Sequence, residues 1–262
     1  MKLNFYKYQG TGNDFIMVDN RTPVLSKNDT KLIKFLCDRK FGIGADGLIL
    51  LEKPENSRDD FKMVYFNADG NESSMCGNGG RCLVAFAKFL GIISEKAAFT
   101  AIDGFHEAVI EDGKVGLKMM DVKGISAVGN AFFLNTGSPH HVIFSEGVEQ
   151  TDVKREGAAI RYSTQYESKG GTNVNFSSFL GASTFKVRTY ERGVEDETLS
   201  CGTGVTAVAV AAHYSGKTAS NKVNLETPGG ELSVSFTPEG DKYTNVWLTG
   251  PAQQVFKGEI TC

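Results

Sequence analysis

Few features of this chain favour a membrane-bound, secreted or nucleic-acid-binding protein. The longest apolar run, VTAVAVAA at 205–212, is far shorter than the ~20 residues that a membrane-spanning helix needs. The N-terminal segment 1–15 contains no apolar run of signal-peptide length. Lysines and arginines number 28 against 31 aspartates and glutamates, so the net charge of −3 offers no attraction to nucleic acid or to an anionic membrane. We therefore expect a cytoplasmic protein without nucleic-acid or membrane partners.

Cysteine and proline are also scarce, and the cysteine spacing excludes two common uses of thiols. The five cysteines are an odd number without paired spacing, which argues against a disulfide framework. Cys76 and Cys82 stand six residues apart with no histidine pair beside them, so we expect no metal site. The chain has thirty glycines, many of them in clusters, and only six prolines. Clustered glycines indicate tight turns at which the backbone approaches a ligand.

Two segments, 61–91 and 185–216, repeat one pattern. Each passes from an alternating strand-like stretch through an acidic turn to Cys-Gly-x-Gly, and then into an apolar stretch of helical length. The pattern predicts helices over 80–90 and 205–214, with Cys76 and Cys201 in front of them. A helix N-terminus favours the thiolate form of cysteine and also binds carboxylates. Two such thiols facing one bound carboxylate would move a proton across a carbon centre without a cofactor.

The repeat also divides the chain. Strand-like segments alternate with glycine turns over most of the sequence, at 3–9, 14–20, 48–53, 61–67, 106–112, 114–120, 131–137, 140–145, 185–191, 222–230, 231–236 and 245–251. Further helices are expected at 29–41 and 152–160. Because Cys76 and Cys201 lie 125 residues apart, we expect an α+β protein of two similar halves, 1–119 and 120–262. The last strand-like segment, within 252–262, is expected to cross back onto the first half. The halves should pack closely, with the active site in the cleft between them.

Other readings of these motifs are weaker. The segment GIGADG at 42–47 follows an expected helix and precedes a strand, the reverse of a dinucleotide fingerprint, so we interpret it as a glycine-rich turn. Cys37 and Cys82 lie in apolar helical patterns, which is typical of buried core thiols. A Cys–His hydrolase would use one cysteine with His140 or His141 and would not need a duplicated cysteine turn. Thiol–disulfide enzymes usually keep both cysteines in one C-x-x-C.

NADGNESSMCGNGGRC and YERGVEDETLSCGTG together resemble the diaminopimelate epimerase family, as do GTGNDF, FGIGADG, GSPHHV and TNVNF. The resemblance covers nearly the whole chain in the same order. It implies two pseudo-symmetric domains, each a curved antiparallel sheet around a central helix. It also implies a cofactor-independent epimerase that interconverts LL- and meso-diaminopimelate, acting as a homodimer. A proline racemase-like isomerase and an amino-acid-binding protein without turnover remain the alternatives.

The resemblance assigns roles to residues motif by motif. Cys76 and Cys201 are then the two catalytic bases. Contacts to the reacting carboxylate come from the helix starts, at Gly77, Asn78, Gly202 and Thr203. The ammonium groups and the distal carboxylate of the substrate fall to Asn13, Asn67, Asn173, Glu191 and Arg192. Among these, we expect Arg192 to bind the distal carboxylate, because a guanidinium takes a carboxylate bidentately.

Two positions, Gly47 and Ser138, depart from the family pattern, and His140 is expected to support the catalytic thiols. His140 is expected near the cleft, where it helps to set thiol protonation together with Glu191. Gly47 stands where some relatives have a glutamine that reaches the ligand, and Ser138 stands where many have asparagine. The turn from Glu191 to Cys201 is one residue longer than the commoner version.

Overall fold

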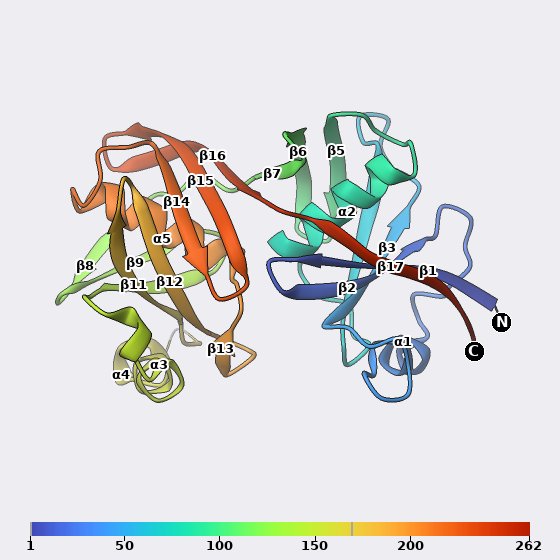
Figure 1. The fold of residues 1–262 in the computed structure, drawn as a ribbon, viewed down its shortest axis with the longest axis horizontal. Coiled ribbons are helices and arrows are strands. Elements are labelled where there is room, and N and C mark those ends of the chain that lie inside the picture. Colours follow the sequence, from blue (N-terminus) through green and yellow to red (C-terminus); the bar gives the residue numbers. More distant parts are fainter. Residues whose placement is uncertain (1, 169) are drawn as a thin grey trace. The chain divides into compact units, whose positions relative to one another are not determined.

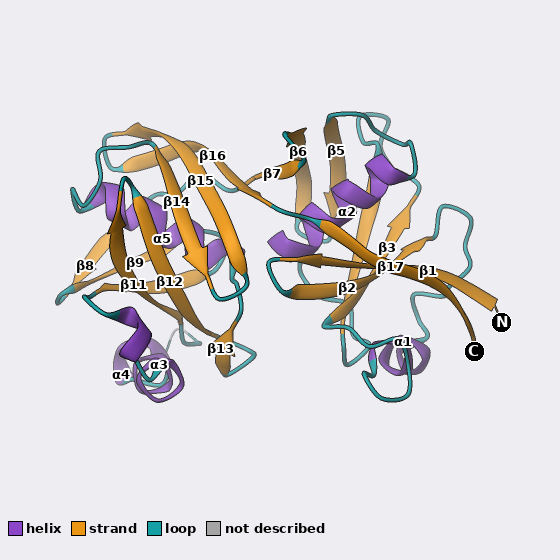
Figure 2. Ribbon diagram, in the orientation of Figure 1, coloured by secondary structure: helices purple, strands orange, loops and turns teal. Residues whose placement is uncertain are grey.

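The computed structural model describes residues 2–168 and 170–262, whose contacts divide the chain into two compact units. The first unit contains the residues up to Leu117 together with Gly250–Cys262, and the second is Lys118–Thr249. The sequence placed the boundary between 119 and 120. Strands dominate both units and helices are few (Figure 2), which confirms the α+β class.

The first unit holds eight strands and two helices within the described residues. Its strands are β1 (Lys2–Gly10), β2 (Asn13–Asp19), β3 (Gly47–Glu52), β4 (Phe61–Asn67), β5 (Lys96–Ala101), β6 (Gly104–Glu111), β7 (Lys114–Lys118) and β17 (Gln253–Thr261). Its helices are α1 (Thr30–Cys37) and α2 (Gly77–Phe89). The C-terminal strand β17 pairs with β1 along almost its whole length.

The second unit has a similar set of elements. Its strands are β8 (Ser126–Val128), β9 (Ala131–Asn135), β10 (Pro139–Phe144), β11 (Asn173–Gly181), β12 (Thr184–Glu191), β13 (Asp196–Thr198), β14 (Lys222–Thr227), β15 (Gly230–Glu239) and β16 (Lys242–Gly250). Its helices are α3 (Val153–Arg161), α4 (Thr164–Glu167) and α5 (Gly202–Tyr214), with a 3-10 turn η1 at Val148–Gln150.

Both units follow one order of strand pairing. The first runs β17-β1-β2-β3-β4-β5-β6-β7, and only β2–β3 and β4–β5 are parallel. The second runs β8-β9-β10-β11-β12-β14-β15-β16, and only β10–β11 and β12–β14 are parallel. A parallel pair needs a long crossover. The helices α2 and α5 supply it at the same step in each unit, which confirms the predicted pseudo-symmetry.

The crossover helices α2 and α5 are also the cores of their units (Figure 1). Every residue of α5 from Val205 to Ala212 is buried, and α2 is buried from Asn78 to Val84. A helix that is apolar on all sides is stable only when other elements surround it. Strands β9 to β12, β14 and β15 contact α5, as β1 to β4, β6 and β17 contact α2. No helix in the described part of the chain combines the length and apolar character needed to cross a membrane.

The first helix is shorter than its apolar pattern predicted. It was expected over 29–41 but ends at Cys37, after starting at the Asp29 cap whose side chain accepts from Leu32 N. Beyond it, the GIGADG segment folds back as the predicted turn, and Ile43 N and Gly44 N both donate to Leu36 O, at 2.9 and 3.0 Å. Because these bonds occupy the carbonyl that would extend the helix, α1 stops there.

The two thiols predicted to lie in the core are buried there. Cys37 is 3% exposed and Cys82 is 0% exposed. Burial raises the pKa of each to about 12. Cys262, by contrast, is exposed.

We expect Cys82→Ser to destabilise the fold by about 1–3 kcal/mol, because a hydroxyl loses more than a thiol on burial without a partner. Urea unfolding of the reduced protein measures this loss. Cys262→Ser is the control and should change the unfolding free energy by less than about 0.5 kcal/mol. Equal stability of the two variants would contradict the core assignment.

Candidate active site

The predicted site residues occupy equivalent strand ends in the two units. Gly47 opens β3 and Asn173 opens β11, which have the same place in the two sheets. Asn67 closes β4 as Glu191 closes β12. The central helix follows each of the latter strands, so each unit gathers its candidate residues at one sheet edge next to a helix start.

Cys76 is the N-cap of α2 and Cys201 is the N-cap of α5, which confirms that a cysteine precedes each central helix. The helices begin at 77 and 202 rather than at 80 and 205. Asp29 caps α1 through its side-chain oxygen, but within the described residues neither cysteine side chain makes a capping hydrogen bond to a backbone N–H of its own helix. A helix start without a side-chain cap is suited to receive an anion.

Asn13 is the residue that contacts Cys76 in the first unit. The Cys76 Sγ donates to Asn13 Oδ1 at 3.5 Å, and Asn78 Nδ2 donates to the same oxygen at 3.4 Å. The other end of the amide, Asn13 Nδ2, donates to the Asp46 carboxylate at 2.6 Å. Since a carboxylate only accepts, this bond fixes the amide with its oxygen toward the thiol.

A group of charged residues that the sequence did not indicate supports Asn13. Arg39 Nη2 lies 2.8 Å from Asp46 and 2.6 Å from Asp14, and Lys7 Nζ lies 2.7 Å from Asp14. Burial alone would raise the pKa of Asp14, but Arg39 and Lys7 outweigh it and hold that pKa well below its usual range. The Lys7 side chain is 7% exposed, whereas those of Arg39 and Asp46 are 58% and 44% exposed, so the network runs from a buried lysine to the surface beside Asn13.

Gly47 faces Asn67 directly across the β3–β4 ladder. A Cβ atom at Gly47 would lie 2.5 Å from Phe66 O and 2.5 Å from Tyr65 Cε2. No side chain fits there without a shift of the backbone or of the tyrosine ring. In this chain the Tyr65 ring therefore occupies the space next to Gly47, and Asn67 stands exposed at the end of its strand.

Arg81, in the first turns of α2, is a buried cation that sequence analysis missed. It is 0% exposed, and burial lowers its pKa. Its Nη2 donates to Asn78 Oδ1 at 2.9 Å and to Thr11 Oγ1 at 3.2 Å, and its Nη1 donates to Gly77 O at 3.4 Å. Its Nε has no hydrogen-bond partner among residues 2–168 and 170–262. Arg81 thus fixes the Asn78 side chain and the Gly77 carbonyl at the start of α2.

Thr203 joins Cys201 to His140 in the second unit. The Thr203 Oγ1 lies 3.5 Å from Cys201 Sγ and 2.9 Å from His140 Nε2. His140 is fully buried, and burial together with the charge of Arg192 lowers its pKa to about 3. The imidazole is therefore neutral at physiological pH. The hydrogen bond seen for Glu191 is with Thr198, whose hydroxyl donates to Oε2 at 2.9 Å.

Asn173 ties together two other predicted residues. Its Nδ2 donates to Ser138 Oγ at 2.8 Å and to Pro139 O at 2.9 Å, and its Oδ1 accepts from Arg192 N at 2.8 Å. A serine at 138 thus has a defined role in this chain, because its hydroxyl accepts from the buried Asn173 amide. These bonds place the backbone of Arg192 next to the turn that precedes β10.

Glu195 anchors the long turn between Glu191 and Cys201. Its φ of 60° is a left-handed conformation that non-glycine residues seldom adopt. Its carboxylate accepts from Gly193 N at 2.9 Å, Arg161 Nη2 at 3.0 Å, Tyr162 Oη at 2.8 Å and Tyr190 Oη at 3.1 Å. Burial opposes ionisation, yet these donors together lower the pKa of Glu195 to about 2.

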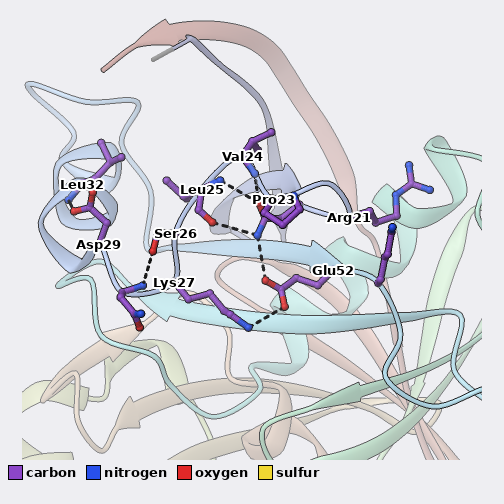
Figure 3. Close-up of a pocket in the computed structure, with 12 residues that line it drawn as sticks. Arg21, Pro23, Val24, Leu25, Ser26, Lys27, Asp29, Leu32 and Glu52 are labelled. Atoms are coloured by element: carbon purple, nitrogen blue, oxygen red, sulfur yellow. Dashed lines mark hydrogen bonds and ion pairs between the residues drawn. The ribbon is translucent and has the colours of Figure 1, made fainter.

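A hollow of 860 Å³ in the first unit contains none of the predicted site residues (Figure 3). Asn20 at its floor is fully hydrogen-bonded, since Oδ1 accepts from Val24 N and Leu25 N and Nδ2 donates to Leu25 O and Glu52. This amide staples the loop after β2. Within the described ranges, no group of three or more His, Cys, Asp or Glu is placed to hold a metal ion.

Comparison with known proteins assigns the family. The family model described as diaminopimelate epimerase matches residues 5–120 and 132–255. A protein of Flavobacterium psychrophilum named diaminopimelate epimerase is 56% identical over 98% of this chain and all of the relative. One of Aquifex aeolicus with the same name is 41% identical over 99% of this chain and 98% of its own. This chain belongs to the diaminopimelate epimerase family.

Solved structures with the same fold extend beyond the diaminopimelate epimerase family. A phenazine biosynthesis protein of the PhzF family from Bacillus anthracis has a TM-score of 0.79 at 11% identity, with full coverage of both chains. A hydroxyproline epimerase from Agrobacterium vitis, solved with trans-4-hydroxy-L-proline, has a TM-score of 0.71 at 14% identity and covers 99% of this chain and 92% of its own. At these identities the likeness shows the fold alone.

For this member of the diaminopimelate epimerase family, we expect Glu195→Gln to be less stable than the wild type at pH 7. The folded pKa of Glu195, about 2, lies below the ~4.3 of an unfolded glutamate. The stability that Glu195 adds is therefore complete above the unfolded pKa of ~4.3. It is lost as the pH falls towards 2, and the two proteins should then converge. Urea midpoints at pH 7 and pH 3 measure the difference.

The matched control is Glu226→Gln, on the exposed face of β14, which should shift neither midpoint appreciably. A Glu195→Gln midpoint equal to that of the wild type at pH 7 would contradict the anchoring role.

Proposed function

We propose that this chain is a diaminopimelate epimerase that interconverts LL- and meso-2,6-diaminopimelate, in lysine and peptidoglycan-precursor synthesis. The observation that carries the proposal is a cysteine N-cap on each of two equivalent central helices. Membership of the diaminopimelate epimerase family supports the substrate.

In the proposed reaction, one thiolate removes the α-proton while the opposite thiol delivers a proton to the other face of the same carbon. The mechanism requires Cys76 and Cys201 to share about one proton in the resting enzyme, so they titrate as a coupled pair. Negative charge builds on the reacting carboxylate as the proton leaves. The backbone N–H groups of the helix starts, including those of Asn78 and Thr203, stabilise that charge. The chemistry needs no pyridoxal group, metal or flavin.

Substrate specificity is assigned to the strand ends. Arg192 binds the distal carboxylate as a planar two-donor fork, with Asn67 beside it as a neutral donor. Asn173 contributes by holding Arg192, because its two amide hydrogens already go to Ser138 and Pro139. Asn13 and Glu191 complete the set that holds the ammonium groups. The bond from Arg192 N to Asn173 supports this assignment, because it keeps the two residues adjacent. A shorter amino acid would leave these polar groups unpaired, which is heavily penalised.

We further propose that the enzyme is a cytoplasmic homodimer. Its chemistry needs reduced thiols, which a reducing compartment maintains, and two-fold dimers are the commonest symmetric assemblies. Fractionation of the native host tests the location, and sedimentation equilibrium tests the assembly. A monomer over the micromolar range would contradict the dimer.

The decisive test is turnover of LL-diaminopimelate in D₂O without added cofactor. The product should carry deuterium at the inverted carbon, because the delivered proton comes from a thiol that exchanges with solvent. Mass spectrometry with chiral separation measures both events. Product without deuterium, or activity that depends on pyridoxal phosphate, would falsify the two-thiol mechanism.

The matched variants for that assay are Cys76→Ala and Cys201→Ala. Each should lose at least 10²–10⁴-fold in kcat, since each face of the carbon needs its own acid or base. Cys262→Ser should keep wild-type turnover. A Cys76→Ala enzyme with most of its activity would leave only one thiol in the reaction.

A second prediction concerns Arg192. We expect Arg192→Lys to lower kcat/KM for LL-diaminopimelate nearly as much as Arg192→Ala, because an ammonium cannot reproduce the two-donor fork. Lysine, which lacks the distal carboxylate, should be a very poor substrate of the wild type. Steady-state assays of LL-diaminopimelate, lysine and proline on the three proteins measure this. If proline proved the best substrate, the chain would instead be a proline-type racemase.

A further inference from the structure

Asn175 is a buried amide in β11 that no part of the proposed reaction uses. It is 0% exposed. Its Nδ2 lies 3.0 Å from His140 Nδ1 and donates to His141 O at 3.3 Å, and its Oδ1 accepts from Thr189 Oγ1 at 3.0 Å. The residue therefore has a partner for each end of its amide, and one of them is the imidazole behind Thr203.

The partners of Asn175 determine which way its amide faces. The His141 carbonyl is only an acceptor, so the amide must turn its NH₂ group toward that carbonyl and toward His140 Nδ1. An NH₂ group can donate only to an unprotonated ring nitrogen. The ring proton of neutral His140 must then lie on Nε2.

The position of that proton decides the role of the Thr203 hydroxyl. His140 Nε2–H donates to Thr203 Oγ1 at 2.9 Å, so the hydroxyl accepts there and has its own hydrogen to give elsewhere. The Cys201 sulfur lies 3.5 Å from the same oxygen, an ordinary length for a hydrogen bond to sulfur. A hydroxyl that donates to a thiolate makes a charge-assisted bond, which favours the ionised form.

We propose that Asn175 is a positioning residue that holds His140 as its Nε2–H tautomer and thereby makes Thr203 a hydrogen-bond donor to the Cys201 thiolate. The inference rests on the proposed function only in treating Cys201 as a reacting thiol. It assigns the relay Asn175, His140, Thr203 and Cys201 one direction of donation, from the strand to the sulfur.

The packing around the relay agrees with this direction. Gly204 follows Thr203 in α5, and a Cβ there would lie 2.4 Å from Asn175 Oδ1, so the amide and the helix start are in close contact. The titratable and charged groups near His140 are few: Glu191 ends β12, Arg192 follows it, and His141 is the next residue of β10. Strands β9 and β11 carry no charged side chain, and α5 carries none before His213. Arg192 also disfavours a second proton on His140.

The experiment measures the tautomer and the thiol separately, without substrate. Nitrogen-15 NMR of histidine-labelled enzyme should show the His140 proton on Nε2 between pH 6 and 9. Iodoacetamide labelling of Cys201, followed by peptide mass spectrometry over a pH series, gives the midpoint of thiolate formation. In Asn175→Leu, which keeps the side-chain volume, the Nε2–H signal should weaken and the midpoint should rise, with about a tenfold slower reaction at pH 7.

Two kinds of control separate the relay from packing. Ser177→Ala changes a buried hydroxyl two residues along the same strand, one that has no hydrogen-bond partner among the described residues, and should leave both readouts unchanged. Thr203→Val should raise the Cys201 midpoint as Asn175→Leu does, whereas Thr203→Ser, which keeps the hydroxyl, should restore it. If Asn175→Leu fails to fold, the wild-type NMR signal and the Thr203 pair decide the matter.

An Nδ1–H signal in the wild type, or Cys201 midpoints of Asn175→Leu and Thr203→Val that match the wild type, would overturn the proposal. Because both readouts are taken without substrate, a wild type that fails to epimerise diaminopimelate refutes the proposed function and not the relay. In Asn175→Leu, a shifted Cys201 midpoint combined with an unchanged Nε2–H signal of His140 would assign the effect to packing and would also overturn the proposal.

Discussion

Close contact between each central helix and its surrounding sheet is the constraint on which the rest of the structure depends. A Cβ at Gly79 would lie 2.9 Å from Ile49 Cδ1, and one at Gly204 would lie 2.4 Å from Asn175 Oδ1. Glycine at these positions lets the first turn of α2 and of α5 lie directly on strand ends. The cysteine before each turn is thereby held next to the polar residues of those strand ends. The second glycine of each Cys-Gly-x-Gly pattern is the residue that makes this close contact possible.

The cysteine turns and central helices were predictable because a repeated local pattern encodes them, whereas strand β11 was not. In β11 the polar residues Asn173, Asn175 and Ser177 alternate with the apolar Val174 and Phe176, and all five are buried. The apolar face packs with α3, and the polar face serves the buried network around His140. A strand with a buried polar face does not show the usual contrast between a core side and a solvent side. Strand β5 was missed for another reason, since alanines supply two of its three buried positions.

The supporting networks were beyond reach of local pattern for a different reason. Lys7, Asp14, Arg39 and Asp46 come from four separate segments and meet only in the folded unit. In its local sequence each of these four residues resembles an ordinary charged surface residue, so no local pattern predicts the network. Glu195 is intermediate, because the turn that contains it differs from the family pattern, whereas the Arg161 and tyrosine partners that hold it are visible only in the fold. The residues proposed to bind the substrate lie in recognisable motifs, whereas those that position them are brought together only by the fold.

The catalytic cysteines proposed for the two halves have hydrogen-bond partners of opposite type, an acceptor at Cys76 and a donor at Cys201. Asp46 fixes Asn13 with its oxygen toward Cys76, and an amide oxygen only accepts, so this partner suits a protonated thiol. Around Cys201 the relay from Asn175 supplies a donor, which suits a thiolate. In the proposed pair that shares one proton, such a difference biases the resting proton toward Cys76, whereas identical surroundings would divide it equally between the sulfurs. The duplication thus supplies the symmetric frame, and the different partners of the two cysteines, Asn13 at Cys76 and Thr203 at Cys201, make their surroundings unequal.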